Sequence, residues 1–412
     1  MTRRTLACAL VVSLFLAATL AAADWPQFRG PNHDNKSTET GLLKTWPAGG
    51  PKLLWTATGC GAGYGSPAVS GSTIYLTGDV DGKACLLTFD LNGKPKNHAA
   101  FGKENTVDPS KFFGGRSTPT VEGGFVYVAG AFGELACLDA KTLAPKWQIN
   151  ISEKFHGKLP QWEYADSPLI DGDNLICTPG GPNATIVALN KKTGETVWTS
   201  KGLSDSAAYA TCARMTLDKM PTIVTMTAKG LVGVSAKTGQ FLWRFDKLVN
   251  PYANCPSPVF LGNRIFCASA FAAGAVDLRV TESGVVATEA WMSKDLHSRT
   301  GGYVLVDGYI YGNNEVGPIC LDWKTGEKKW SAERKEMGCV TYADGMLYIL
   351  GETTRKVALA QASPDGFTVA GEFTLPGGGK DPFWAYPALA NGRLYVRHWD
   401  SLFCYDIKAE AK

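Results

Sequence analysis

The sequence has little net charge and no long block of one sign. Of its 412 residues, 41 are Lys or Arg and 38 are Asp or Glu, which gives a formal net charge of +3. This balance excludes the strongly basic surface that a nucleic-acid-binding protein needs. Hydrophobic residues make up 45% of the chain, so an intrinsically disordered protein is excluded as well. We therefore expect a folded protein with no nucleic-acid partner.

Motifs of common catalytic chemistry are also missing. The chain contains no Gly-x-Ser-x-Gly, no His-Glu-x-x-His and no Gly-x-x-x-x-Gly-Lys-Ser/Thr sequence. Its five His residues are scattered and lack metal-ligand spacing. Asp79, Asp81 and Gly82 resemble the start of a calcium loop, but the Glu required at the twelfth position is absent. The residues therefore predict no catalytic group and no metal site.

No apolar run is long enough to cross a membrane comfortably. The longest, Leu6 to Leu20, has about 15 residues where roughly 20 are needed. It follows Arg3 and Arg4 and precedes three alanines, the order found in secretory signal peptides. We predict a signal peptide over 1–23, a mature chain without a membrane span, and a periplasmic or secreted location.

Turn residues are abundant and recur at regular intervals. The chain has 46 Gly and 22 Pro. A Ser/Thr-Pro pair, a short strand, a Gly turn and an aromatic strand follow one another in several places, as from Ser66 through Gly71 to Tyr75. Asp307-Gly308, Asp344-Gly345 and Asn391-Gly392 mark weaker copies. Such turns between short apolar strands are typical of β-hairpins, because Asn, Asp and Gly tolerate positive φ.

The second half of each repeat ends on tryptophan. Asp139, Asn190, Ser235 and Asp322 each begin a turn sequence, and a Trp follows each of them by eight residues. A variant places Trp291 seven residues after Gly284. We expect large aromatic side chains in this position to pack between neighbouring repeats. The predicted packing residues are Trp55, Trp147, Trp198, Trp243, Trp291 and Trp330.

Eight such units of about 49 residues fit into the chain after the signal, within the range for propeller blades. The last unit stops before its own fourth strand, whereas Leu53–Thr56 has the sequence of a fourth strand. The prediction is an all-β, eight-bladed β-propeller of four-stranded antiparallel blades, whose last blade is closed by an N-terminal strand. Residues 24–52 then form an N-terminal extension, 53–408 the propeller and 409–412 a tail.

The repeated Asp-x-Lys-Thr-Gly-x-x-x-Trp sequence resembles the blades of the pyrroloquinoline quinone (PQQ) dehydrogenase-like propellers. The segment Asp24 to Pro31, which reads Asp-Trp-Pro-Gln-Phe-Arg-Gly-Pro, resembles the start of secreted bacterial members. One branch of that superfamily contains alcohol dehydrogenases that hold the quinone and Ca²⁺ on the propeller axis. The other contains non-catalytic propellers, among them the scaffold subunit of the outer-membrane protein assembly machinery.

The resemblance leaves both an enzyme and a platform open. The dehydrogenase branch typically carries two adjacent cysteines over the quinone, and this chain has neither a Cys-Cys pair nor a Cys-x-x-Cys-His haem motif. A non-catalytic binding or assembly platform is therefore the preferred interpretation. The alternative is a PQQ- and Ca²⁺-dependent oxidoreductase, in which Glu163 or Asp166 with Asn254 supplies oxygen ligands. A glycan-binding propeller is a third possibility.

Loops that precede the innermost strands surround the central funnel of a propeller, and here they are rich in aromatic and polar residues. A protein, a small molecule or a glycan is the expected partner at this face. The sequence leaves the oligomeric state open. The candidate ligand-binding residues are Tyr64, Arg116, Trp162, Glu163, Tyr164, Asp166, Tyr209, Tyr252, Asn254, Arg299, Trp384 and Tyr386.

Ten cysteines follow the predicted signal. Cys137, Cys320 and Cys404 occupy equivalent places in different blades, where the separation is expected to be too large for a disulfide. Small buried thiols are the preferred interpretation. Cys212 and Cys255 occupy matching positions in adjacent blades and are the one candidate pair for a disulfide.

Overall fold

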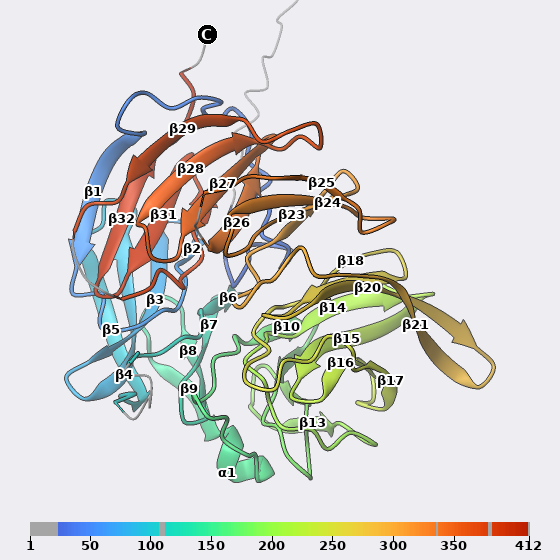
Figure 1. Cartoon of the computed structure of the whole chain (residues 1–412). Helices are drawn as coiled ribbons and strands as arrows, with labels where there is room; N and C mark the ends of the chain where they lie inside the picture. The colour runs from blue at the N-terminus through green and yellow to red at the C-terminus, as the bar shows by residue number, and fades with distance from the viewer. Residues whose placement is uncertain (1–23, 107–111, 335–336, 378–380, 411–412) are drawn as a thin grey trace, which may run out of the picture.

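The computed structural model describes residues 24–106, 112–334, 337–377 and 381–410. Within these ranges the chain forms eight four-stranded sheets in which every pair of neighbouring strands is antiparallel. The sheets follow one another around a common axis, and the chain colour runs once around the ring in Figure 1. The predicted eight-bladed propeller is confirmed. The predicted signal peptide, 1–23, lies outside the described residues.

The first four blades are formed by the following strands. Blade 1 comprises β2 (Ala68–Ser70), β3 (Thr73–Val80), β4 (Lys83–Asp90) and β5 (Pro95–Lys103). Blade 2 comprises β6 (Thr120–Glu122), β7 (Phe125–Ala129), β8 (Glu134–Asp139) and β9 (Pro145–Asn150), followed by the short helix α1 (Ile151–Phe155). Blade 3 comprises β10 (Leu169–Asp171), β11 (Asn174–Cys177), β12 (Val187–Asn190) and β13 (Thr196–Thr199). Blade 4 comprises β14 (Ala213–Leu217), β15 (Met220–Thr227), β16 (Gly230–Ser235) and β17 (Phe241–Phe245).

The other four blades follow the same order. Blade 5 comprises β18 (Val259–Leu261), β19 (Arg264–Ala268), β20 (Ala273–Thr281) and β21 (Gly284–Ser293). Blade 6 comprises β22 (Val304–Val306), β23 (Tyr309–Asn313), β24 (Pro318–Asp322) and β25 (Lys328–Ser331). Blade 7 comprises β26 (Gly338–Ala343), β27 (Met346–Gly351), β28 (Lys356–Gln361) and β29 (Val369–Thr374). Blade 8 comprises β30 (Ala388–Ala390), β31 (Arg393–His398), β32 (Ser401–Asp406) and, from the N-terminal side, β1 (Lys52–Thr58).

The chain ends meet in blade 8, as predicted. β1 pairs antiparallel with β32 from Lys52–Asp406 to Thr58–Ser401, with a bulge between Leu53 and Trp55. The pairing supplies the outermost strand that the last repeat lacks. Because the first and last strands share one sheet, the ring closes without leaving an open break between blades.

The hairpin turns have the backbone conformations that their sequences predict. Asp307 and Gly308 both have positive φ, 48° and 84°, as do Asn391 and Gly392 with 60° and 67°. Two consecutive residues of this kind are typical of the tight turns that fit the right-handed twist of paired strands. The turn between the third and fourth strands is stabilised by a side chain instead. In blade 6 the Asp322 carboxylate accepts hydrogen bonds from the backbone N–H groups of Lys324 and Thr325.

The tryptophans at the blade ends contact the turn of the following blade. Trp147 Nε1 donates to the Lys191 carbonyl oxygen over 3.0 Å, and Trp198 Nε1 donates to Ala236 over 3.0 Å. Trp55, Trp291 and Trp330 make the same kind of bond to Leu91, Trp323 and Ser363. Each indole thus joins two blades through both its ring and its one polar hydrogen.

Trp243 is the exception within this set. Its Nε1 has no hydrogen-bond partner among the described residues, although the side chain is buried. Blade 5, on which it packs, has no tight turn at the corresponding place, because β20 and β21 continue as a long ladder to Thr281–Gly284. The hairpin extends from the body of the ring in Figure 1. No turn carbonyl is therefore offered to this indole.

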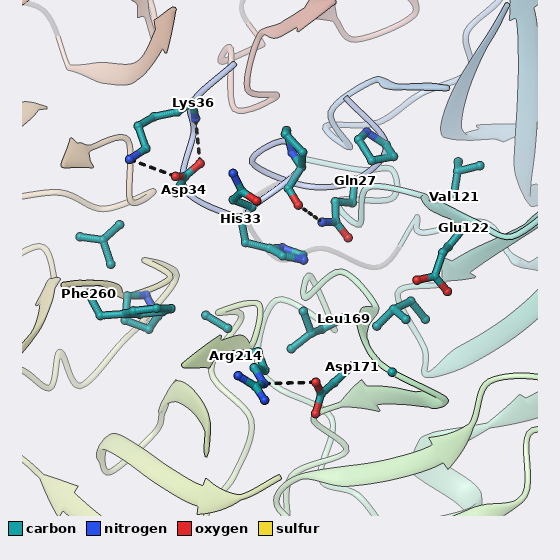
Figure 2. A pocket seen from close by; sticks show the side chains of 18 of the residues that line it. Gln27, His33, Asp34, Lys36, Val121, Glu122, Leu169, Asp171, Arg214 and Phe260 are labelled. Atoms are coloured by element: carbon teal, nitrogen blue, oxygen red, sulfur yellow. Dashed lines mark hydrogen bonds and ion pairs between the residues drawn. The ribbon is translucent and has the colours of Figure 1, made fainter. Parts of the chain in front are cut away.

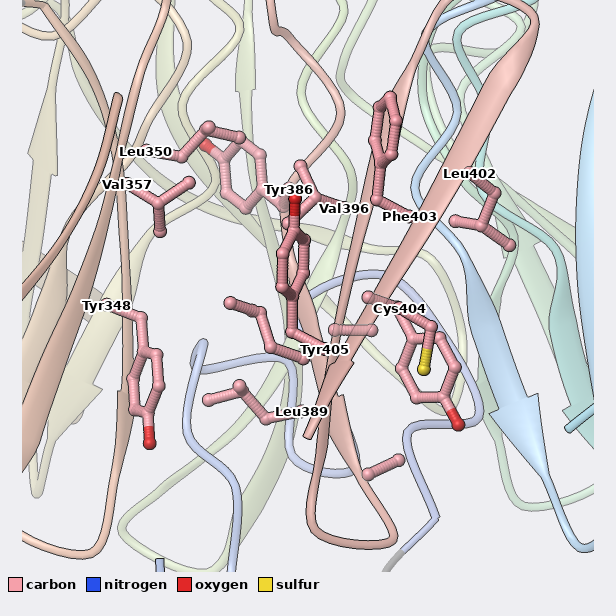
Figure 3. Packing of buried hydrophobic residues seen from close by; sticks show 14 of the residues in the cluster. Tyr348, Leu350, Val357, Tyr386, Leu389, Val396, Leu402, Phe403, Cys404 and Tyr405 are labelled. Carbon is pink, nitrogen blue, oxygen red and sulfur yellow. The ribbon is translucent and has the colours of Figure 1, made fainter. Parts of the chain in front are cut away.

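The core lies between the blades rather than in one central cluster. Blades 7 and 8 show the pattern, with Tyr348, Leu350 and Val357 facing Leu389 and Val396 across the interface (Figure 3). Successive residues of a strand point to opposite faces, so both faces of a sheet are buried against neighbouring blades. Apolar runs such as Leu347–Leu350 in β27 follow from this two-sided burial.

Residues 24–37 cross the centre of the ring and fill its axis; we call them the axial plug. Trp25 pairs with Val69 of blade 1 through two backbone hydrogen bonds of 2.9 and 2.8 Å. The Arg29 guanidinium donates to the Ser257 and Tyr303 carbonyl oxygens on the far side of the ring. Further along, Asn35 and Ser37 hydrogen-bond the backbone of Tyr342 in blade 7. The plug therefore ties opposite blades together.

The candidate disulfide between Cys212 and Cys255 is wrong. All ten described cysteines are free thiols. Cys212 belongs to the apolar cluster between blades 3 and 4, whereas Cys255 lines the cavity at the mouth of the funnel. The two side chains therefore lie in different surroundings and form no bridge. No helix among the described residues is long and apolar enough to cross a membrane.

Candidate functional site

A cavity of about 580 Å³ opens on the face of the ring where each blade's last strand leads into the next blade's first strand. We call it the funnel cavity. Eight of the twelve candidate ligand-binding residues line it. These are Tyr64, Arg116, Trp162, Tyr209, Tyr252, Arg299, Trp384 and Tyr386. Most precede an innermost strand by a few residues, so the propeller brings residues from distant parts of the sequence to one mouth.

Aromatic rings form most of the wall. Trp384 lies between Tyr64 and Phe112, with ring centroids 4.8 and 4.9 Å away. Trp162 and Tyr209 form a second pair at 6.0 Å, and the Tyr209 hydroxyl accepts a hydrogen bond from the Trp162 backbone N–H. Burial raises the pKa of Tyr209 to about 12, so this hydroxyl stays neutral at physiological pH. The rings pack against one another and form an apolar surface.

Glu163, Tyr164, Asp166 and Asn254 do not belong to the lining, because their side chains turn into the surrounding blades. Tyr164 donates to the Pro179 carbonyl oxygen over 2.6 Å. Asp166 accepts from the Thr178 hydroxyl over 2.6 Å, and burial raises its pKa to about 6. Asn254 binds the backbone of Asn250 through both its oxygen and its nitrogen. These groups stabilise the loops that carry the aromatic residues.

Arg116 lines the cavity, but its guanidinium serves the loops as well. Its two terminal nitrogens donate to the carbonyl oxygens of Trp162 and Phe112 over 3.0 and 2.8 Å. The Glu163 carboxylate lies 3.7 Å away and supplies the opposite charge. Arg116 therefore joins the loop before blade 2 to the loop before blade 3.

Several lining residues were not predicted from the sequence. Phe28 comes from the axial plug, and its ring lies 5.2 Å from that of Tyr386. Phe271, Glu315 and Glu352 come from loops between the second and third strands of blades 5, 6 and 7. Those loops carry no repeated motif. Phe28 lies in the Trp-Pro-Gln-Phe-Arg-Gly segment that carries the family resemblance, so the sequence did contain a signal for this one residue.

Glu352 and Arg299 form the one charged pair in the lining. Arg299 Nη2 lies 3.3 Å from Glu352 Oε1, and the same oxygen accepts a hydrogen bond from Trp384 Nε1 over 2.9 Å. The Glu352 side chain is 7% exposed, whereas that of Arg299 is 57% exposed. Glu352 Oε2 has no hydrogen-bond partner among the described residues. The second oxygen of a buried carboxylate is thus left without a donor.

A second cavity of about 560 Å³ lies at the opposite end of the axis, beside the turns between first and second strands. Figure 2 shows it between Gln27 and His33 of the axial plug and the Arg214–Asp171 ion pair of blades 3 and 4. Burial and the charge of Arg29 lower the pKa of His33 to about 4, so its ring is neutral. The axial plug contributes residues to both cavities and separates them.

Eight blades joined by tryptophans, with a loop-lined funnel on one face, define a PQQ-like propeller. The chain belongs to the family described as outer membrane protein assembly factor BamB, whose sequence model matches residues 52–332. No curated protein matches the sequence.

Solved structures show the same fold at low sequence identity. BamB from Moraxella catarrhalis is similar with a TM-score of 0.63 and 15% identity, covering 88% of this chain and 99% of that one. The quinohemoprotein alcohol dehydrogenase from Comamonas testosteroni gives 0.64 and 13%, covering 95% and 81%. Sqt1 from Saccharomyces cerevisiae gives 0.57 and 12%, covering 89% and 100%. These similarities extend to the fold alone.

The oxygen donors expected for a Ca²⁺ ion beside a quinone do not line the funnel cavity. The three oxygen donors considered for the ion, Glu163, Asp166 and Asn254, bind three different parts of the loops and do not converge. Within the part of the chain that the structure describes, no three His, Cys, Asp or Glu side chains lie close enough to hold a metal.

Proposed function

We propose that this chain is an exported, non-catalytic platform that binds its partner at the funnel cavity. The observation that carries the proposal is the open ring of aromatic side chains, several of which pack against one another. Amphipathic rings give large contact areas at low entropic cost, and they dominate the energetics of protein recognition. Export is inferred from the signal peptide predicted over 1–23.

The rim of the cavity supports a macromolecular partner. Tyr252 is 67% exposed and Phe271 is 54% exposed, and both lie at the mouth on the blade 5 side. Exposed large apolar groups gathered beside a concave surface are typical of interaction sites. Residues of the axial plug lie at the base of the funnel and also line the second cavity, so we expect a ligand to bind from the funnel face.

The polar chemistry of the cavity supports binding rather than catalysis. Arg116 and Tyr209 contact the loops that carry them. Side chains that are bound to the loops in this way fix the shape of a binding surface. A catalytic acid, base or nucleophile must instead reach the substrate in the correct geometry.

Site-directed photo-crosslinking in the native host tests the platform. A photoreactive residue in place of Tyr252 is expected to give one discrete adduct, which Trp384→Ala abolishes. The matched control places the same residue at Val197, which is 51% exposed on the outermost strand of blade 3. An equal adduct pattern at both positions contradicts the proposal.

Titration of the purified protein with PQQ and Ca²⁺ tests the enzyme alternative. We expect no saturable change in tryptophan fluorescence and no dye reduction with alcohols or sugars. Tight quinone binding together with alcohol- or sugar-dependent dye reduction overturns the non-catalytic interpretation. A polysaccharide pull-down, with Trp384→Ala as control, separates a glycan ligand from a protein partner.

A further inference from the structure

The carboxylate of Glu352 is a buried charged group of the funnel wall that, among the described residues, has unused hydrogen-bonding capacity. Its Oε1 accepts from Trp384 Nε1 at 2.9 Å and from Arg299 at 3.3 Å. Its Oε2 is buried, and no described group donates to it. A buried acceptor without a donor costs roughly 1–3 kcal/mol, and more when it is charged. A ligand that supplies a donor at this place removes that cost.

The charge of the lining favours a cation. Arg116 is compensated by Glu163, which lies 3.7 Å away. The remaining charged groups of the lining are Arg299 on one side and Glu315 and Glu352 on the other. One cation thus stands against two carboxylates. An incoming positive charge restores the balance in a region that the surrounding rings keep partly dry.

The only charged donor to Glu352 among the described residues is poorly anchored. Arg299 is 57% exposed, and its Nε contacts the Met337 sulfur, which is a weak acceptor. An ion pair with an exposed, flexible side chain contributes little stability. Arg299 can therefore be displaced from Glu352 at small cost, whereas the carboxylate itself stays fixed by the Trp384 indole.

Resting on the proposed platform function, we propose that the funnel cavity binds an organic cation, an ammonium or guanidinium group, that donates to Oε2 of Glu352 and displaces Arg299 from the carboxylate. The apolar part of the ligand packs against the aromatic wall, where Trp384 and Tyr64 also offer ring faces that attract cations. The shared chemistry has two sources, a lysine or arginine side chain of a partner protein and a free amine.

Calorimetric titration with two matched peptides tests the proposal. The probe is acetyl-Gly-Lys-Gly-amide, and the control is the same peptide with its lysine Nε acetylated. We expect the charged peptide to bind at least tenfold more tightly. Spermidine serves as the free-amine probe, and binding at least tenfold tighter than the charged peptide assigns the site to a small amine. Equal affinity of the charged and the acetylated peptide overturns the proposal.

Two substitutions have opposite expected effects. Glu352→Gln keeps the acceptor for Trp384 but removes the charge, so affinity for the charged peptide falls at least tenfold. Arg299→Met removes the competing cation, so affinity rises several-fold. Glu315→Gln is the control for a more exposed carboxylate in the same lining, with a change below threefold. Circular dichroism and the melting temperature verify that each variant is folded. An unchanged affinity in folded Glu352→Gln overturns the assignment.

The two proposals fail separately. If the Tyr252 crosslink persists in Glu352→Gln and both peptides bind equally, the platform proposal stands and the cation proposal fails. If binding of the charged peptide depends on Glu352 but no specific crosslink forms at Tyr252, the cation proposal stands and the macromolecular platform proposal fails.

Discussion

Replacing Gly239 by Ala tests the contact between a blade-end tryptophan and the turn of the next blade. Gly239 has φ +72°, and a Cβ built there falls 2.5 Å from Trp198 Cε3 and 2.7 Å from the Thr199 carbonyl oxygen. Gly345 is the matched control, with φ +78° and no atom within 4 Å of the same Cβ. Only the first substitution forces two blades apart.

The magnitudes follow from these two geometries. Both alanines adopt a left-handed conformation, which costs about 1–2 kcal/mol. Gly239→Ala adds an overpacking cost of about 1–3 kcal/mol, because the Trp198 indole and the Thr199 carbonyl are both held by their own blade. We expect losses of about 1–2 kcal/mol for Gly345→Ala and about 2–5 kcal/mol for Gly239→Ala. Urea unfolding followed by tryptophan fluorescence measures both.

A double-mutant cycle identifies the source of the difference. In a Trp198→Ala background the cost of Gly239→Ala is expected to fall toward that of Gly345→Ala, since only the Thr199 carbonyl contact remains. Equal losses at Gly239 and Gly345 in the natural background refute the reasoning. An unchanged cost of Gly239→Ala after removal of the indole refutes it as well.

Three other predictions concern stability, and a fourth concerns the thiols. Burial raises the pKa of Asp166 from 3.8 to about 6, so the folded state binds this proton more tightly than the unfolded state. The stability that this proton contributes is fully present below pH 3.8 and is lost as the pH rises through about 6, a change of roughly 3 kcal/mol. Asp166→Asn should remove this pH dependence of the unfolding free energy, which urea titrations across that range measure. Trp198→Phe should cost about 1 kcal/mol more than Trp243→Phe in urea unfolding, because only Trp198 loses a hydrogen bond; equal costs contradict this. Arg29→Met removes two buried bonds that link the axial plug to blades 5 and 6 and should cost roughly 2–4 kcal/mol by the same assay; a cost below 1 kcal/mol shows that the plug does not brace the ring. A dithionitrobenzoate assay in guanidinium without reductant should count ten thiols in the mature chain, and a count of eight would reveal a disulfide.

The identity of the residues that face the funnel followed only partly from the sequence. Position before an innermost strand selected Trp162 and Trp384, and both line the cavity. The same argument placed Glu163 and Asp166 in the cavity, although both turn into the blades. Glu163 has φ +56°, a backbone conformation that no pattern around it signals. A single dihedral of this kind reverses the direction of a side chain, and loops lack the strict period that sets side-chain direction in strands.

The sequence by itself determined the eight blades, their hairpin turns, the positions of the blade-end tryptophans and the closure of blade 8 by β1. All of these depend on local patterns repeated about every 49 residues, where the period of two in strands and the turn chemistry leave few choices. Only the tertiary structure decided that residues 24–37 fill the axis and that Glu352 lies unpaired at one oxygen beside Trp384. These contacts join segments hundreds of residues apart, such as Arg29 and Ser257, and they arise from the closed ring rather than from any repeat.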